Sequence, residues 1–105
     1  MSDTQSDIKQ LVDDNTILLF MKGIPDAPMC GFSMRAVNVL NALGAEFQAV
    51  NVLDHPEIRE GIKVFSNWPT IPQLYVAGEF VGGSDIVMQM FESGDLKTMI
   101  EASAS

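Results

Sequence analysis

The apolar positions at the start of the chain predict a helix followed by a buried strand. Within the polar, acidic segment from Asp3 to Asp14, residues Ile8, Leu11 and Val12 recur at the spacing of one helix face. The stretch from Ile17 to Met21 is then apolar at every position, which is typical of a strand covered on both sides. The chain is therefore expected to enter a sheet directly after a short amphipathic helix.

A second helix and a second strand are predicted next. A loop with two prolines, Gly23 to Met29, separates the first strand from a helix over residues 32–43 whose apolar positions form one stripe. Gly44 lies where a glycine commonly ends a helix, and residues 46–52 alternate imperfectly between apolar and polar, as in a strand. The order strand, helix, strand favours a parallel pair joined by a right-handed crossover.

The second half of the chain is predicted to contain a helix, a hairpin and two closing helices. Asp54 is expected to cap the helix, with Pro56 tolerated in its first turn. Gly61 lowers the helix propensity of this segment by up to about 1 kcal/mol relative to alanine. Ala77-Gly78 is a tight hairpin signal between two short strands. The closing helices are expected over residues 84–92 and 95–101.

This order of elements predicts an α/β fold. Strand, helix, strand, helix and a hairpin, with extra helices at the ends, form the thioredoxin-like fold, a four-stranded mixed sheet flanked by helices. A length of 105 residues suits one domain, and the sequence shows no linker, repeat or low-complexity tract. Residues 1–105 are therefore expected to form a single domain.

The charge of the chain limits its partners. Six lysines and arginines against fourteen aspartates and glutamates give a net charge of −8, which argues against binding to nucleic acid or to anionic membranes. Four of the cations, Lys22, Arg35, Arg59 and Lys63, lie in the middle of the chain. A basic spot on an acidic protein suggests a small anionic ligand, and scattered solvated charges are the alternative.

The sequence also favours a cytoplasmic location. Its first ten residues are polar and acidic, unlike a signal peptide, and the apolar run from Ile17 to Met21 is far too short to span a membrane. A lone thiol is typical of a reducing compartment, with a processed organellar form as the alternative.

Cys30 is the only cysteine of the chain, and His55 is its only histidine. These counts exclude an intramolecular disulfide and any metal site built from several cysteines or two histidines of one chain. Cys30 lies between the proline loop and the second helix, where unpaired backbone amides and the helix dipole stabilise a thiolate. A reactive thiol is therefore favoured over a buried, inert one, whereas His55 is expected on the surface at a helix start.

The residue three positions after Cys30 is Ser33, where a Cys-x-x-Cys motif would place its second sulfur. Ser33 is expected either to cap the helix or to donate a hydrogen bond to the Cys30 sulfur. Because a hydroxyl cannot form a sulfur–sulfur bond, a mixed disulfide at Cys30 has to be resolved by an external thiol.

The segment Trp68-Pro69-Thr70-Ile71-Pro72 precedes the third strand and favours a ligand site. A cis peptide bond at Ile71-Pro72 would leave backbone groups of Thr70 and Ile71 free to pair with an extended peptide. A rigid loop without such a role is the alternative.

A second candidate segment is Gly82-Gly83-Ser84-Asp85, which ends a strand and opens a helix. Glycines before a helix start form a cradle of backbone amides for an anion. Asp85 either pairs with a ligand amine or caps the helix. A cradle for a carboxylate beside an acid for an amine suits the end group of an amino acid.

Together these motifs resemble those of the monothiol glutaredoxins of the Cys-Gly-Phe-Ser class. The matching segments follow one another in the family's order over essentially the whole chain. They are Met21-Lys22-Gly23, the proline loop that follows it, Cys30-Gly31-Phe32-Ser33, Trp68-Pro69-Thr70-Ile71-Pro72-Gln73 and Gly82-Gly83-Ser84-Asp85. The resemblance implies a single glutaredoxin domain. The chain departs from many relatives at Ser84, where they have a second cysteine, so a disulfide from Cys30 to that position is impossible here.

The resemblance implies glutathione as the ligand. Lys22 would lie near the reactive sulfur, favour its thiolate and contact glutathione. Arg59, with help from Lys63, would hold the glycine carboxylate. The segment Thr70-Ile71-Pro72 would present its backbone to the cysteinyl unit, and Gly83-Ser84-Asp85 would receive the γ-glutamyl end.

The resemblance also implies a [2Fe–2S] cluster that bridges a homodimer. The two irons need four thiolate ligands. One chain supplies only Cys30, so two chains supply two thiolates and two bound glutathiones supply the rest. The cluster would then be transferred to apo iron–sulfur proteins, with a BolA-like protein as an alternative partner.

The leading interpretation is a glutathione-dependent iron–sulfur carrier rather than a turnover enzyme, because Cys30 has no resolving cysteine. The alternative is a monothiol oxidoreductase that uses Cys30 as its catalytic nucleophile to remove glutathione from protein mixed disulfides. A third interpretation is a redox-inactive interaction domain in which Cys30 is incidental.

Overall fold

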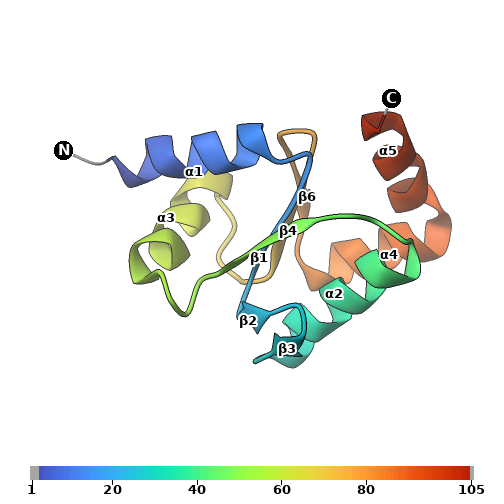
Figure 1. Ribbon diagram of the computed structural model, residues 1–105, viewed down its shortest axis with the longest axis horizontal. Coiled ribbons are helices and arrows are strands. Elements are labelled where there is room, and N and C mark those ends of the chain that lie inside the picture. The colour runs from blue at the N-terminus through green and yellow to red at the C-terminus, as the bar shows by residue number, and fades with distance from the viewer. Residues whose placement is uncertain (1–2, 105) are drawn as a thin grey trace.

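The apolar strand β1 (Ile17–Met21) lies at the centre of the sheet in the computed structural model, which describes residues 3–104 (Figure 1). Strand β4 (Gln48–Asn51) pairs with β1 in parallel, and β5 (Gln73–Val76) pairs with its other side in antiparallel orientation. Strand β6 (Glu79–Gly82) completes the order β4-β1-β5-β6. The predicted thioredoxin-like fold with a four-stranded mixed sheet is confirmed.

Helices cover both faces of this sheet, which explains why every residue of β1 is buried. Leu18 and Phe20 of β1 face α1 (Thr4–Asp14) and α3 (Pro56–Ser66), the helices on the left of Figure 1. The alternate residues of β1 face α2 (Gly31–Ala42), α4 (Ser84–Ser93) and α5 (Asp95–Ser103) on the right. The period of two along the strand thus divides the core into two layers.

The loop before Cys30 is more regular than its two prolines suggest. Strands β2 (Gly23–Ile24) and β3 (Ala27–Pro28) form a small antiparallel hairpin where an irregular loop was expected. Gly23 has a φ of +93°, and a Cβ there would lie 2.6 Å from the carbonyl oxygen of Ala27. Only glycine therefore allows the chain to turn so tightly before Cys30.

The prediction that Asp54 caps α3 is wrong. The helix begins at Pro56, so His55 occupies the N-cap position, exposed and without a side-chain capping bond. The Asp54 carboxylate lies one residue too early and accepts a hydrogen bond from Asn51 Nδ2 at 3.3 Å. The surface position predicted for His55 is confirmed.

Gly61, a poor helix former, lies inside α3 at a position where a larger side chain would collide with α1. A Cβ at this position would lie 2.7 Å from Thr4 Cγ2 and 3.0 Å from Ile8 Cδ1. The missing side chain therefore lets α1 approach α3 closely over the sheet.

The turn between β5 and β6 has the predicted hairpin geometry. Ala77 and Gly78 both have positive φ angles, of 52° and 81°, as a two-residue turn of type I′ requires.

Among residues 3–104, no helix combines the length and the apolar character that crossing a membrane requires.

Candidate functional site

Cys30 lies at the N-cap of α2, directly after the β2–β3 hairpin. The backbone amide of Ser33 lowers the pKa of the Cys30 thiol most, and the amide of Phe32, the Lys22 ammonium and the Ser33 hydroxyl lower it further, while burial opposes them. The thiol is partly exposed, and a Cβ at Gly31 would meet no atom within 4 Å. The sulfur is therefore both predisposed to ionise and open to another molecule.

The Ser33 side chain is fully buried and connects Cys30 with the preceding strand. Its Oγ accepts a hydrogen bond from the Lys22 backbone N–H at 3.1 Å, and its hydroxyl also helps to lower the pKa of Cys30. The carbonyl of Lys22 accepts the Met29 N–H at 2.9 Å. Both backbone groups of Lys22 are thus fixed beside the thiol.

The loop that precedes β5, residues 68–72, forms a second side of the site. The Ile71-Pro72 peptide bond is cis, as predicted. The side chain of Gln73, which is fully buried, donates hydrogen bonds through Nε2 to the carbonyls of Trp68 at 3.0 Å and Thr70 at 3.2 Å. The loop is thereby tied to the sheet.

The junction between β6 and α4 forms a third side. Gly83 is the N-cap of α4, and a Cβ there would lie 3.1 Å from Trp68 Nε1 and 3.5 Å from the Pro72 carbonyl oxygen. The glycine therefore leaves space between the helix start and the loop. Ser84 is 8% exposed, and its buried Oγ has no hydrogen-bond partner among residues 3–104, whereas the Asp85 side chain in the first turn of α4 is exposed.

Helix α3 contributes two cations. The buried Nε of Arg59 has no hydrogen-bond partner in the described part of the chain, and Lys63 Nζ lies 3.2 Å from Glu60 Oε2. Arg35 does not join them, because it is exposed on α2 with its guanidinium carbon 5.7 Å from the centre of the Phe32 ring. The expected basic spot therefore contains Lys22, Arg59 and Lys63 but not Arg35.

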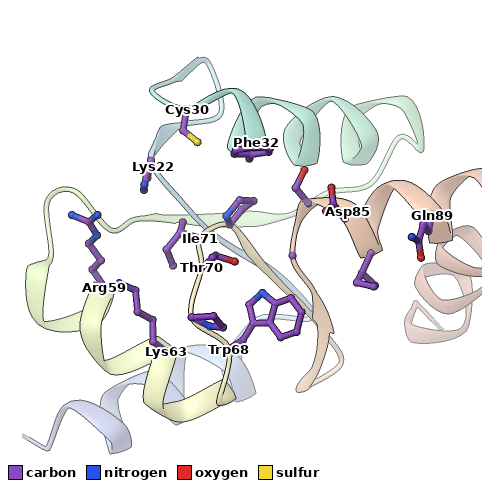
Figure 2. Close-up of a pocket in the computed structure, with 15 residues that line it drawn as sticks. Lys22, Cys30, Phe32, Arg59, Lys63, Trp68, Thr70, Ile71, Asp85 and Gln89 are labelled. Atoms are coloured by element: carbon purple, nitrogen blue, oxygen red, sulfur yellow. The ribbon is translucent and has the colours of Figure 1, made fainter.

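These three sides and α3 enclose a cavity of about 730 Å³. Figure 2 shows Cys30 and Lys22 at one end, Arg59 and Lys63 on one flank and Asp85 on the opposite flank. The residues that line the cavity include all ten predicted site residues, which are Lys22, Cys30, Arg59, Lys63, Thr70, Ile71, Pro72, Gly83, Ser84 and Asp85. Motifs from four separate parts of the chain thus meet in one place.

Five further residues line the cavity that were not assigned to the site from the sequence, namely Phe32, Trp68, Pro69, Ile86 and Gln89. The first three belong to the recognised motifs. Gln89 lies four positions after Asp85 along α4, so helical spacing was a signal that could have found it, whereas Ile86 directly follows Asp85 and no spacing rule pointed to it. Among residues 3–104, no three histidine, cysteine or acidic side chains are arranged to hold a metal ion.

Comparison with known sequences assigns the chain to a family. A sequence profile described as glutaredoxin matches residues 17–81, which contain Cys30 and the loop before β5. The chain belongs to the glutaredoxin family. An uncharacterized monothiol glutaredoxin of Synechocystis is 52% identical over 99 residues, which cover 94% of this chain and 92% of that protein. The predicted resemblance to monothiol glutaredoxins is therefore confirmed.

Solved glutaredoxin structures have the same fold. A monomeric truncated mutant of Trypanosoma brucei 1-C-Grx1 is 46% identical, with a TM-score of 0.86 over 99% of this chain and 94% of that one. A buckwheat glutaredoxin, solved as a complex with glutathione, is 26% identical, with a TM-score of 0.84 over 96% of this chain and 90% of that one.

Proposed function

We propose that this monothiol glutaredoxin binds glutathione in the cavity beside Cys30. The observation that carries the proposal is a pair of buried polar atoms, Arg59 Nε and Ser84 Oγ, which find no hydrogen-bond partner within residues 3–104 and belong to residues lining the same cavity. Buried polar groups are normally hydrogen-bonded, so a polar ligand that reaches both would satisfy them. The buckwheat relative that was solved with glutathione supports the same ligand.

The charges around the cavity match the tripeptide. Arg59, helped by Lys63, would hold the glycine carboxylate, and Lys22, beside the Cys30 sulfur, would contact the tripeptide. The segment Thr70-Ile71-Pro72 would pair with the cysteinyl backbone. Gly83-Ser84-Asp85 would receive the γ-glutamyl end, with the helix amides on its carboxylate and Asp85 on its amine.

We further propose that the chain carries a [2Fe–2S] cluster between two subunits and transfers it to apo iron–sulfur proteins in the cytoplasm. Such a cluster takes four thiolates, and the described chain offers the one thiol of Cys30 and no cluster of metal-binding side chains around it. Two subunits and two glutathiones would complete the set. A BolA-like protein could replace one subunit.

Anaerobic purification with glutathione tests this function. We expect a coloured dimer with a visible iron–sulfur spectrum, and a colourless monomer for Cys30→Ser. The matched control is Ser6→Cys, which adds a thiol on α1 and leaves Cys30 in place. A wild-type protein that stays colourless and monomeric after reconstitution with iron, sulfide and glutathione would contradict the carrier function.

The alternative function is removal of glutathione from protein mixed disulfides, which the lowered pKa of Cys30 favours. The Cys30 thiolate would attack the glutathionyl sulfur and release the protein thiolate, forming a Cys30–glutathione disulfide. A second glutathione thiolate would attack that glutathionyl sulfur, regenerate the Cys30 thiolate and leave as glutathione disulfide. Rapid turnover of a glutathionylated protein by a colourless monomer would favour this function over cluster transfer.

A further inference from the structure

Gln73 is a polar side chain in the core that does not line the cavity. It begins β5, has 0% of its surface exposed and pairs in register with Phe20 of β1. A buried amide is tolerated only when its donors and acceptor find partners, because an unmade hydrogen bond in the core is destabilising.

The partners of Gln73 are the loop and a buried tyrosine. Its Nε2 donates to the carbonyl oxygens of Trp68 at 3.0 Å and Thr70 at 3.2 Å, so both amide protons are used. Its Oε1 accepts the hydroxyl of Tyr75 at 3.3 Å. The amide is therefore a clamp between the sheet and the two loop residues that flank Pro69.

The surroundings keep this clamp in one orientation. Tyr75 is 1% exposed, with its ring centre 5.6 Å from that of Phe20 and 5.4 Å from that of Phe80. Burial raises the pKa of Tyr75 to about 12, so its hydroxyl keeps its proton and donates to the amide oxygen. Carbonyl oxygens can only accept, so the two loop carbonyls by themselves direct the nitrogen of Gln73 toward the loop, and the Tyr75 hydroxyl satisfies the remaining oxygen.

The clamped loop forms the centre of the cavity wall. Trp68 is also held through its backbone N–H, which donates to Ser66 Oγ at 3.2 Å. Its indole Nε1 lies 3.1 Å from the place where a Cβ of Gly83 would be. A shift of the loop would therefore change the gap to the start of α4 as well as the backbone next to Pro72.

We propose that Gln73 is a positioning residue for glutathione: by holding the carbonyls of Trp68 and Thr70 against the sheet, it sets the alignment of the Thr70-Ile71-Pro72 backbone that the ligand meets. The inference rests on the proposed glutathione site. Gln73 itself touches no ligand, and its effect passes through the loop.

Two variants of Gln73 test the clamp. Gln73→Met has similar length and no donors, and we expect it to lower glutathione affinity about tenfold at every pH, as measured by calorimetry. Gln73→Glu is a buried carboxyl with a raised pKa that can donate one bond only when protonated. Its affinity relative to wild type should fall as the pH rises from 5 to 8 and recover on acidification. Urea denaturation at each pH measures the loss of stability that the buried carboxylate itself causes, and the affinity should fall even at pH values where the protein remains fully folded.

Trp68 supplies a readout without ligand, because it is the only tryptophan of the chain. Its emission should shift to the red in Gln73→Met, and in Gln73→Glu the shift should reverse at low pH. The matched control is Tyr75→Phe, which removes a hydrogen bond from Gln73 and keeps both bonds to the loop, so its affinity and emission should stay close to wild type.

The outcomes separate this inference from the proposed function. Wild-type affinity and emission in both Gln73 variants, or an equal loss in Tyr75→Phe, would overturn the positioning role. If the wild-type protein binds no glutathione, the proposed ligand and with it the role toward glutathione are wrong, and the emission of Trp68 decides whether Gln73 still fixes the loop.

Discussion

The reactivity of Cys30 depends mainly on the backbone that follows it. The amide of Ser33 lowers the pKa of the thiol most, and the charge of Lys22 contributes less than either the Ser33 or the Phe32 amide. Amides at a helix start persist whatever the neighbouring side chains are. The thiolate should therefore tolerate most substitutions around it, with graded rather than complete losses.

Replacing Lys22 tests this ranking. Lys22→Met removes a positive charge that favours the thiolate, so the pKa of Cys30 should rise and its alkylation by iodoacetamide at neutral pH should slow by roughly two- to fivefold. The pH profile of the alkylation rate measures the change. Lys9→Met is the matched control, because Lys9 pairs with Asp13 at 2.8 Å on the exposed side of α1. An unchanged profile in Lys22→Met would remove Lys22 from the causes of the lowered pKa.

Arg59→Ala, with Arg35→Ala as its matched control, tests whether glutathione is held by a specific contact. Arg59→Ala should weaken glutathione binding by roughly 10- to 100-fold, the expected loss of charge-assisted hydrogen bonds. Arg35→Ala changes the net charge equally but removes a side chain that stacks on Phe32 and does not line the cavity. Calorimetric titration of both variants measures the difference, and equal losses would mean that general electrostatics rather than a specific contact attracts the ligand.

At the scale of single elements, glycines at the two ends of α2 differ in backbone conformation alone. Gly31 begins the helix and Gly44 follows its end, and a Cβ at either position would meet no atom within 4 Å. Only Gly44 has a positive φ, of +67°, and its N–H donates to the Asn41 carbonyl at 3.0 Å.

Gly44→Ala should therefore lower the free energy of unfolding by about 1 kcal/mol, because an L side chain is strained in the left-handed region. Gly31→Ala should leave the stability unchanged or raise it slightly. Urea denaturation of both variants measures the difference. Equal stabilities would show that the helix end adapts its backbone to the new side chain.

Sequence periodicity was sufficient for elements whose structure is decided locally. The strand Ile17–Met21 has the predicted bounds, because five apolar residues between polar neighbours are too few for a typical helix and suit a strand covered on both faces. The hairpin at Ala77-Gly78 was also predictable, because its two turn residues alone favour a tight hairpin. The β2–β3 hairpin and the cap of α3 were missed, since they depend on a contact between Gly23 and Ala27 and on which residue directly precedes the first helical turn.

The cavity exists only at the scale of the whole molecule, because segments far apart in the sequence form its walls. The ten site residues were expected in one place because the motifs resemble those of the monothiol glutaredoxins, and that resemblance alone gave Lys22, Arg59 and Lys63 a role in the site. Two features could not be foreseen, because they follow from distances between groups on different elements: the clamp by Gln73, and the buried atoms of Arg59 and Ser84 that have no hydrogen-bond partner in the described part of the chain.

The stability of the whole molecule should respond to alkaline pH through Tyr75. Burial raises its pKa from 10.0 to about 12, so the protonated phenol stabilises the folded state fully below pH 10, and this contribution is lost as the pH rises toward 12. The free energy of unfolding, measured by denaturant titration, should fall over that range. Tyr75→Phe cannot ionise and should show a smaller fall, and equal slopes would exclude Tyr75 as the cause.

In Figure 1 the outer end of α1 lies at the upper left and that of α5 at the top right, whereas the β2–β3 hairpin that leads into Cys30 lies at the bottom. A fold whose two ends leave on the side opposite its reactive sulfur behaves as a module. A domain joined at either end should therefore leave the thiol accessible. Evolution by gene fusion, or a fluorescent tag added in the laboratory, therefore has two permissive attachment points on this scaffold.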